Sequence, residues 1–597
     1  MATDGPGRAP ATDAAAALLT RLVERGLRHI VLSPGSRSQG LALVAAELEA
    51  RGLIRLHVRI DERVAGFTAL GIGREDRMPA VVVCTSGTAV ANFLPAVLEA
   101  HHSGVPLLLL TADRPPELRG IGANQATRQP GMFSGFVRLE SDLPVAEALA
   151  ESAEADEVAA FRAAADEGWD AAVGSGSRVA GPVHLNIPFR EPLAGELPGW
   201  VPSSSAEDAA SDPTEADVEA ETVEAEWGAH YQGGGGVGAA LEVVESEPVV
   251  LEAGPRTVVV AGADAGPDAE ELAHAGGFPL IAEIVSGARY GRHLVHGYRT
   301  LLSDAELGGR IERVVVFGHP TLSREVARLL SRSDVEVMAV RGPGEQLNLN
   351  GVTVAVDDVT AARGTVDRDW LGAWMRASRD QVVDLSPAAP DADALSSTVP
   401  AERLGAISAE LGAIRAPVDR AALVDAVWRA TWPHDRLLFG SSRLVRVADE
   451  LLGGKKVPVH ANRGLAGIDG TIATGLGIAA ASQGGAVPGV TRVLLGDLAF
   501  LHDVGALLHP AAEDEPRIQV IVGNDGGGTI FDGLEVAGVA SPRAFDRVQY
   551  TPQTARLEEL ARAYGWEYQR ITTRGALDQA LTSPAGGRQI IEVPLSR

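Results

Sequence analysis

Short apolar runs alternate with longer stretches rich in Ala and Leu through the first third of the chain. Each run is uninterrupted, which is typical of a buried parallel strand, and the stretches between them predict helices. The predicted strands are residues 29–32, 79–84, 106–111 and 183–187, and the clearest helices are 13–25 and 89–101. This alternation predicts a parallel sheet covered by helices on both faces.

The pattern repeats in two further blocks. Their predicted strands are 257–261, 280–282, 313–317 and 335–340, then 436–439, 490–495 and 518–522. The acidic, Pro-broken run 203–226 and the glycines 233–236 predict a solvated linker, and the connector 385–418 is expected to be partly helical. The predicted fold class is α/β, with three doubly wound parallel-sheet domains that span 1–197, 198–405 (which includes the linker) and 406–597.

The charge composition argues against nucleic acid and anionic membranes as partners. The 597 residues carry 52 basic and 79 acidic side chains, a formal net charge of −27. This charge would repel nucleic acid and anionic membranes at long range. No segment has 18 consecutive apolar residues and the first residues lack an apolar signal region, so a cytoplasmic enzyme is expected. The single cysteine, Cys84, lies in an apolar run and is expected to be a core thiol.

Two predicted strands of the third block end in oxygen-bearing residues. Gly496-Asp497-Leu498-Ala499 follows the strand 490–495, and Asn524-Asp525-Gly526 follows the strand 518–522. A carboxylate, a carboxamide and a Gly carbonyl suit Mg²⁺, which is usually shared with the phosphates of a ligand. The glycines 526–528 would let the backbone approach a diphosphate closely. Two ordinary strand-to-helix turns are the alternative interpretation.

The spacing of these two turns resembles the thiamine-diphosphate motif, written GDG, a gap, and then NN. The chain departs from it at Leu498 and Asp525, but the three ligand positions remain. This resemblance predicts a metal–diphosphate cofactor in the last third of the chain.

Asp61-Glu62-Arg63 begins a predicted helix in the first block. The helix dipole favours acidic residues there, so capping alone accounts for Glu62.

Arginines in turns after predicted strands suggest an anionic substrate. The turn 33–38 contains Ser36 and Arg37, and the long polar loop 111–133 contains Arg114, Arg119, Asn124, Gln125 and Arg128. In the third block these positions are Ser442, Arg446 and, in the Gly-rich turn 462–470, Arg463. Arg binds carboxylates through two parallel hydrogen bonds, so the set predicts a substrate with two or more carboxylates. Surface salt bridges could explain any one of these arginines.

Six stretches together resemble the family of 2-succinyl-5-enolpyruvyl-6-hydroxy-3-cyclohexene-1-carboxylate (SEPHCHC) synthases of the menaquinone pathway. They are SPGSRS, DERVAGFTALG, TSGTAVANFLPAVLEA, LTADRPPELRGIGANQATRQPGMF, FGHPTLSR and NRGLAGIDG. The resemblance runs from about residue 12 to the C-terminus and is weakest over 195–255 and 345–435. The fourth stretch separates this family from acetolactate synthases and pyruvate decarboxylases.

The resemblance implies a pyrimidine-binding, a central and a diphosphate-binding domain. Thiamine diphosphate with Mg²⁺ or Mn²⁺ would bind between the first domain of one subunit and the third of another, in a homodimer or a tetramer built as a dimer of dimers. Glu62 matches the glutamate that hydrogen-bonds the aminopyrimidine, and Ile468 matches the apolar residue that holds the cofactor bent. The implied metal ligands are Asp497, Asn524 and the Gly526 carbonyl. The other implied cofactor contacts are Ser86, Gly87, Asn92, Gly496, Leu498, Ala499, Gly527 and Ile530.

The implied reaction is decarboxylation of 2-oxoglutarate and Michael-type addition of the succinyl carbanion equivalent to isochorismate, which gives SEPHCHC and CO₂. The two substrates carry four carboxylates, which accounts for the arginines. The implied substrate contacts are Ser36, Arg37, Arg114, Asn124, Gln125, Arg324, Ser442, Arg446, Arg463 and Phe531.

Two departures from the family pattern concern the lid over the pocket. Gln39-Gly40 stands where Thr-Pro or a similar pair is usual, and Thr529 is an extra residue in the Gly-rich turn. The competing hypotheses are another thiamine-diphosphate carboligase or decarboxylase, and a non-catalytic metabolite-binding regulator. A dinucleotide dehydrogenase lacks support because no GxGxxG opens a helix after the first strand.

Overall fold

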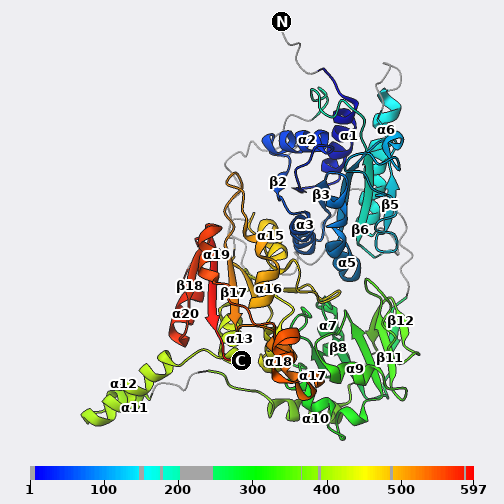
Figure 1. The fold of residues 1–597 in the computed structure, drawn as a ribbon. Helices are drawn as coiled ribbons and strands as arrows, with labels where there is room; N and C mark the ends of the chain where they lie inside the picture. The colour runs from blue at the N-terminus through cyan, green and yellow to red at the C-terminus, as the bar shows by residue number, and fades with distance from the viewer. Residues whose placement is uncertain are drawn as a thin grey trace, which may run out of the picture.

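The computed structural model describes residues 7–146, 154–174, 179–201, 247–362, 364, 366–386, 391–484, 489–583 and 586–597. The predicted linker 203–226 and the glycines 233–236 lie outside the described residues. Within them, the α/β fold class is confirmed: each sheet contains only parallel strand pairs (Figure 1).

The first sheet has six strands in the order β2-β1-β3-β4-β6-β5. They are β1 (His29–Leu32), β2 (Arg55–Val58), β3 (Ala80–Cys84), β4 (Leu107–Asp113), β5 (Leu139–Asp142) and β6 (Pro182–Pro188). The helices α1 (Pro10–Glu24), α2 (Gln39–Ala50) and α6 (Glu154–Val173) cover one face, and α3 (Glu62–Asp76) and α5 (Leu94–Ser103) cover the other. The predicted helix 89–101 is broken into α4 (Thr88–Ala91) and α5, whose first turn contains a proline.

The third sheet repeats the topology of the first, in the order β15-β14-β16-β17-β19-β18. Its strands are β14 (Arg436–Phe439), β15 (Val459–Ala461), β16 (Thr491–Gly496), β17 (Ile518–Asn524), β18 (Glu567–Arg570) and β19 (Arg588–Pro594). One face packs against α13 (Arg420–Ala430), α14 (Arg443–Leu451) and α20 (Arg574–Thr582), the other against α15 (Thr471–Ser482), α16 (Asp497–His502) and α19 (Leu557–Ala563).

The central sheet has five strands in the order β12-β11-β10-β8-β9. They are β8 (Thr257–Ala261), β9 (Leu280–Ala282), β10 (Arg313–Phe317), β11 (Glu336–Val340) and β12 (Val354–Val356). Its helices are α7 (Asp268–Gly276), α8 (Tyr298–Leu302), α9 (Arg324–Leu330) and α10 (Arg368–Arg379), and β7 (Val249–Leu251) pairs separately with β13 (Val359–Ala361). The connector predicted to be partly helical contains α11 (Ala392–Ser396) and α12 (Pro400–Arg415), which project from the body in Figure 1.

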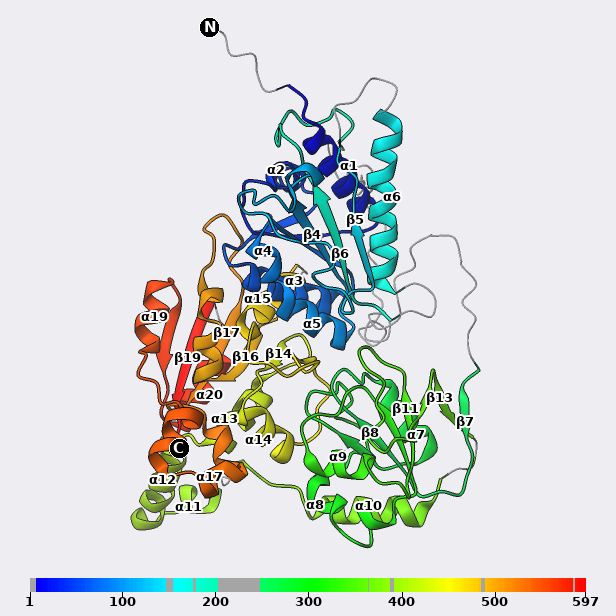
Figure 2. The same ribbon diagram turned by 45° about the vertical axis from the view of Figure 1, so that its right-hand side comes forward.

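Helices α3 and α15 join the first and third sheets into one hydrophobic core (Figure 2). The two backbones touch where glycines remove the side chain: a Cβ on Gly71 would overlap the Thr474 carbonyl oxygen, and one on Gly477 would overlap that of Thr68. This close contact fixes how the ends of the two sheets face each other, and with them the candidate active site.

Substitution of Gly477 by Ala should lower the free energy of unfolding by about 2–3 kcal/mol, because the added methyl group cannot fit between the helices. The control is Gly412→Ala on the exposed face of α12, where nothing lies within 4 Å of the new Cβ. That change should be neutral or stabilising by about 0.5–1 kcal/mol, as expected for Ala in a helix. Urea denaturation of both variants measures the difference, and equal effects would contradict the role of Gly477.

Candidate active site

The carboxyl edge of the first sheet gathers two buried arginines. Arg37 follows β1 and Arg114 follows β4, and both side chains are less than a tenth exposed. Arg37 donates to the Phe189 carbonyl at 3.1 Å, while its Nε is buried without a hydrogen-bond partner. Burial, and then the neighbouring Arg114 guanidinium, lower the pKa of Arg37. Two neighbouring guanidinium groups, of which that of Arg37 is partly unsatisfied, form a receptor for a carboxylate.

The long loop after β4 is tied to the turn after β3. Arg114 donates to the Ser86 hydroxyl (3.2 Å) and to the Asn124 carbonyl (2.8 Å). Ser86 donates to the Gln125 carbonyl, and the Gln125 side chain donates back to the Ser86 carbonyl. A cavity of about 350 Å³ lies beside these residues, lined by Gly87, Thr88, Ala91, Gln125, Ala126, Thr127 and Met132. The structure thus brings Arg37, Ser86, Gly87, Arg114, Asn124 and Gln125 to one edge.

Glu62 occupies the first turn of α3 at the same edge. The helix is capped by Asp61, whose carboxylate accepts from the backbone N–H groups of Arg63 and Val64. The capping interpretation therefore applies to Asp61, which leaves Glu62 free for another role. Glu62 also lies close enough to the buried Cys84 that, after burial itself, its charge raises the pKa of that thiol. Cys84 is the core thiol expected from the sequence.

The predicted metal ligands converge at the carboxyl edge of the third sheet. Gln553 Nε2 donates to Asp497 Oδ2 at 3.0 Å and to Asn524 Oδ1 at 3.3 Å. The Gln553 backbone N–H also donates to the Gly526 carbonyl at 3.2 Å. The side chain and the backbone of one residue, Gln553, thus contact all three predicted oxygen ligands.

This group of oxygens fits a divalent cation shared with a diphosphate. Burial raises the pKa of Asp497 to about 6, so its carboxylate lacks a compensating positive charge from the protein. Among the described residues, no three His, Cys, Asp or Glu side chains cluster as a metal site. With one carboxylate, one amide and one carbonyl from the protein, the remaining positions around Mg²⁺ suit water or phosphate oxygens.

The Gly-rich turn is held by groups that the sequence pattern did not reveal. Asp525, which stands in place of the second Asn of the thiamine-diphosphate motif, forms an ion pair with Arg420 at 2.7 Å. It also accepts a hydrogen bond from Thr529. The extra residue, Thr529, is therefore used to close the turn. Ile530 and Phe531 follow in a short 3₁₀ helix and are partly exposed. The backbone of the turn is accordingly fixed in place for an approaching anion.

A second set of arginines lies between the central and third sheets. Arg446 and Arg463 are flanked by Arg299 and Arg324, and burial, followed by these neighbours, lowers the pKa of Arg446. Arg463 donates to the Thr321 hydroxyl (2.7 Å) and carbonyl (3.1 Å). Ser442 caps α14 and lies against Gly496, the residue before Asp497. These cations are therefore adjacent to the predicted metal site.

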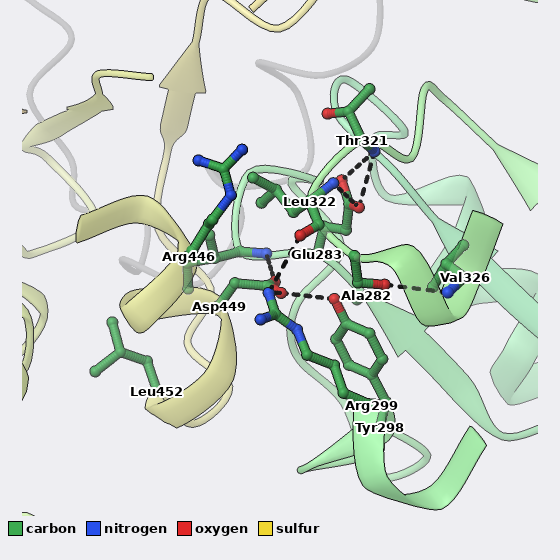
Figure 3. Close-up of polar contacts among 12 residues, drawn as sticks. Ala282, Glu283, Tyr298, Arg299, Thr321, Leu322, Val326, Arg446, Asp449 and Leu452 are labelled. Carbon is green, nitrogen blue, oxygen red and sulfur yellow. Dashed lines mark hydrogen bonds and ion pairs between the residues drawn. The ribbon is translucent and has the colours of Figure 1, made fainter. Parts of the chain in front are cut away.

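Asp449 fixes the geometry of this second set. Its carboxylate accepts from Tyr298 and Arg299, each at 2.6 Å, and from the Ile284 backbone N–H at 2.8 Å. Figure 3 shows the Arg446 guanidinium extending away from Asp449, which leaves Arg446 available to a ligand. Burial raises the pKa of the nearby Glu283, which accepts from the Thr321 and Leu322 backbone N–H groups.

Sequence reasoning missed Gln553, Glu283 and Asp449. Glu283 directly follows a predicted strand, so its position was a usable signal. Gln553 and Asp449 lie in segments without a motif, and only the fold brings them to the site.

Four further predicted residues lie at the surface. Ser36 and Asn92 are exposed, Arg324 pairs loosely with Glu535 at 3.4 Å, and the Ile468 side chain is 37% exposed. Among the described residues, no hydrogen bond or ion pair joins Glu62 to the Asp497 group. The two halves of the predicted cofactor site are therefore not joined by polar contacts within one chain.

Comparison with known proteins places the chain in a class. Residues 12–132 match the family described as thiamine pyrophosphate enzyme, N-terminal TPP binding domain. Together with the repeated sheets, this match defines a thiamine pyrophosphate enzyme.

Full-length relatives identify the family within that class. The chain is 52% identical to the 2-succinyl-5-enolpyruvyl-6-hydroxy-3-cyclohexene-1-carboxylate synthase of Leifsonia xyli subsp. xyli, with 98% of this chain and 97% of the relative covered. The synthase of Clavibacter michiganensis subsp. michiganensis gives the same identity and coverage, and that of Nocardioides sp. is 39% identical over 100% of this chain and 97% of its own. The chain belongs to the SEPHCHC synthase family.

Asp497→Asn should stabilise the cofactor-free protein while it weakens cofactor binding. The folded-state pKa of Asp497, about 6, exceeds the ordinary value of 3.8, so its stabilising effect is lost as pH rises through 6. At pH 7 the substitution should add about 1–2 kcal/mol of stability. It should also weaken Mg²⁺-dependent binding of thiamine diphosphate at least about 100-fold. Urea denaturation and isothermal titration calorimetry measure the two effects.

Asp525→Asn is the matched control. Asp525 is paired with Arg420, so its neutralisation should lower stability. Stability changes of the same sign in both variants would contradict the assignment of Asp497 as an uncompensated buried carboxylate.

Proposed function

We propose that the chain catalyses thiamine-diphosphate-dependent decarboxylation of 2-oxoglutarate and addition of the succinyl unit to isochorismate, which would form the product that the names of its relatives give. The observation that supports the proposal is that Asp497, Asn524 and the Gly526 carbonyl all lie against Gln553, beside a Gly-rich turn. These residues would hold Mg²⁺ or Mn²⁺ and, through it, the diphosphate of the cofactor.

The cofactor would supply an electron sink for the carbanion that decarboxylation leaves. Glu62 would hold a proton at the aminopyrimidine ring, in a site close to the buried Cys84. Ile468 presents an apolar side chain after β15 and would support the cofactor from below. Gly496, Leu498, Ala499, Gly527 and Ile530 would line the diphosphate end, and Ser86, Gly87 and Asn92 the ring end.

The two arginine sets would bind the carboxylates of the substrates. Arg37 and Arg114 lie at the carboxyl edge of the first sheet. Arg446 donates to the Ser442 carbonyl and Arg463 to the Ser441 hydroxyl, in the turn after β14. Four carboxylates on two substrates need several fixed cations in a chain whose net charge is −27. The further contacts in this proposal are Ser36, Asn124, Gln125, Arg324, Ser442 and Phe531.

Two copies of the chain would complete each site. Glu513, in the loop that enters β17, binds Arg59 at 2.7 Å and the Val58 backbone N–H, just before Glu62. Asn524 ends β17, about 20 Å along that strand from its start. Arg63, next to Glu62, donates to the His502 carbonyl at the end of α16, and among the described residues no polar contact joins Glu62 to Asp497, Asn524 or Gly526. A homodimer, or a tetramer of two such dimers, would bring Glu62 of one chain to Asp497 of another.

Each proposed domain contains one of the three large sheets. The pyrimidine-binding domain would span 1–197, the linker and central domain 198–405, and the diphosphate-binding domain 406–597. Among the described residues, no helix is long and apolar enough to cross a membrane. A cytoplasmic location is part of the proposal, in keeping with the strongly acidic composition.

Consumption of 2-oxoglutarate with thiamine diphosphate and Mg²⁺, with isochorismate added or omitted, tests the proposed reaction. Isochorismate-dependent consumption and formation of SEPHCHC are expected. Decarboxylation that is indifferent to isochorismate would indicate a different carboligase. Tight cofactor binding without consumption would indicate a non-catalytic regulator.

Glu62→Gln should keep cofactor binding and abolish most turnover. The amide cannot hold the proton that the carboxylate shares with the ring, so kcat should fall by about 100-fold or more while the cofactor Kd changes little. Steady-state kinetics and calorimetric titration measure both quantities. A variant with near-wild-type kcat would contradict the role of Glu62.

A further inference from the structure

Two buried carboxylates hold the loop that carries Ile468. Glu99, on α5 of the first domain, accepts the Gly464 backbone N–H at 2.9 Å and the Leu465 backbone N–H at 3.0 Å, through a different oxygen for each. Asp503, after α16, accepts the Ile472 and Ala473 backbone N–H groups at 2.8 and 2.9 Å through one oxygen. The first pair of N–H groups precedes Ile468 and the second follows it.

Each carboxylate replaces a partner that the local sequence lacks. Helix α15 begins after Gly470, which has no side chain to cap the free N–H groups of the first turn. Asp503 is that missing cap, supplied from another segment, and it is fully buried. Glu99 is 4% exposed and also lies 3.5 Å from Arg74 and 2.8 Å from the Ser103 hydroxyl. A buried carboxylate with several donors is rigidly oriented.

The loop between these anchors has few other supports. Its backbone is in the left-handed region at Ala466 and Gly470. The Leu465 and Ile468 side chains are 53% and 37% exposed, so side-chain burial does little to fix them. Arg463, at the start of the loop, is bound to Thr321 of the central domain. The polar anchors, together with the buried residues that begin α15, therefore set the position of Ile468, whose own side chain is poorly buried.

We propose that Glu99 and Asp503 are positioning residues that clamp the loop 464–473, so that Ile468 is held in place for the cofactor before it binds. The inference rests on the proposed function for its catalytic consequence, but the clamp itself is a property of the cofactor-free chain. Displacement of a supporting side chain by about 1 Å can cost about 100-fold in rate.

Glu99→Gln is the first test, because the amide nitrogen cannot accept an N–H hydrogen bond and one of the two loop contacts is lost at constant shape. In the cofactor-free protein, amide hydrogen exchange should rise at least about tenfold in peptides covering 464–470 and stay unchanged elsewhere. In the loaded enzyme, kcat should fall about 10- to 100-fold while the Kd for thiamine diphosphate with Mg²⁺ stays within about threefold.

Ser103→Ala is the matched control, since it removes a donor to Glu99 but leaves both loop contacts. Exchange and kcat should stay within about threefold of wild type. Two substitutions of Asp503 distinguish the hydrogen bonds from the negative charge. Asp503→Asn can keep one oxygen toward both N–H groups and should retain slow exchange. Asp503→Leu cannot accept these hydrogen bonds and should raise exchange over 471–474.

Wild-type exchange over 464–473 and wild-type kcat in Glu99→Gln would overturn the proposal. So would a rise in exchange spread over the whole chain, which would indicate global destabilisation. If the wild-type protein fails to turn over 2-oxoglutarate and isochorismate, the proposed function fails, but the exchange experiment still decides whether the clamp exists.

Discussion

The backbone contact between α3 and α15 is the constraint on which the other arrangements depend. Glycines at 71 and 477 let the two helices touch, and the core that forms around them fuses the first and third sheets. Because the helices are in contact, the two sheets cannot slide past each other, and the position of Glu62 relative to Asp497 is fixed within one chain. The proposed function, in which both residues act on one cofactor, draws them from two chains of a dimer, whose symmetry would supply two such sites.

The segment 462–473 contacts residues from the parts of the chain that contain each of the three large sheets. The first domain holds it through Glu99, the central domain through the contact of Thr321 with Arg463, and the third domain through Asp503. The contacts are polar and buried, so the geometry they impose is specific in direction as well as distance. In a chain with a strong negative charge, these contacts thereby hold Arg463 and the apolar Ile468 in fixed positions.

Short, uninterrupted apolar runs predicted many of the buried strands. Residues 257–261, 280–282, 313–317 and 436–439, for example, are strands with the predicted bounds. The edge strands β5, β15 and β18 were missed, and in β18 exposed residues such as Glu567 and Arg570 give no apolar run. The buried strand β19 was missed as well. Motifs predicted the convergence of Asp497, Asn524 and Gly526 because parallel strands end at one edge. Partners such as Gln553 and Asp449 depend on tertiary contacts between distant segments, which no local pattern encodes.

Mixing two inactive variants tests most directly whether each catalytic centre is assembled from two chains. Glu62→Gln and Asp497→Asn dimers would each contain only damaged sites, whereas a mixed dimer would contain one intact and one doubly damaged site. Equal mixing with full subunit exchange should restore about a quarter of wild-type activity with 2-oxoglutarate and isochorismate. Activity no higher than that of the separate variants, with mixed dimers demonstrated by native mass spectrometry, would contradict a site shared between chains.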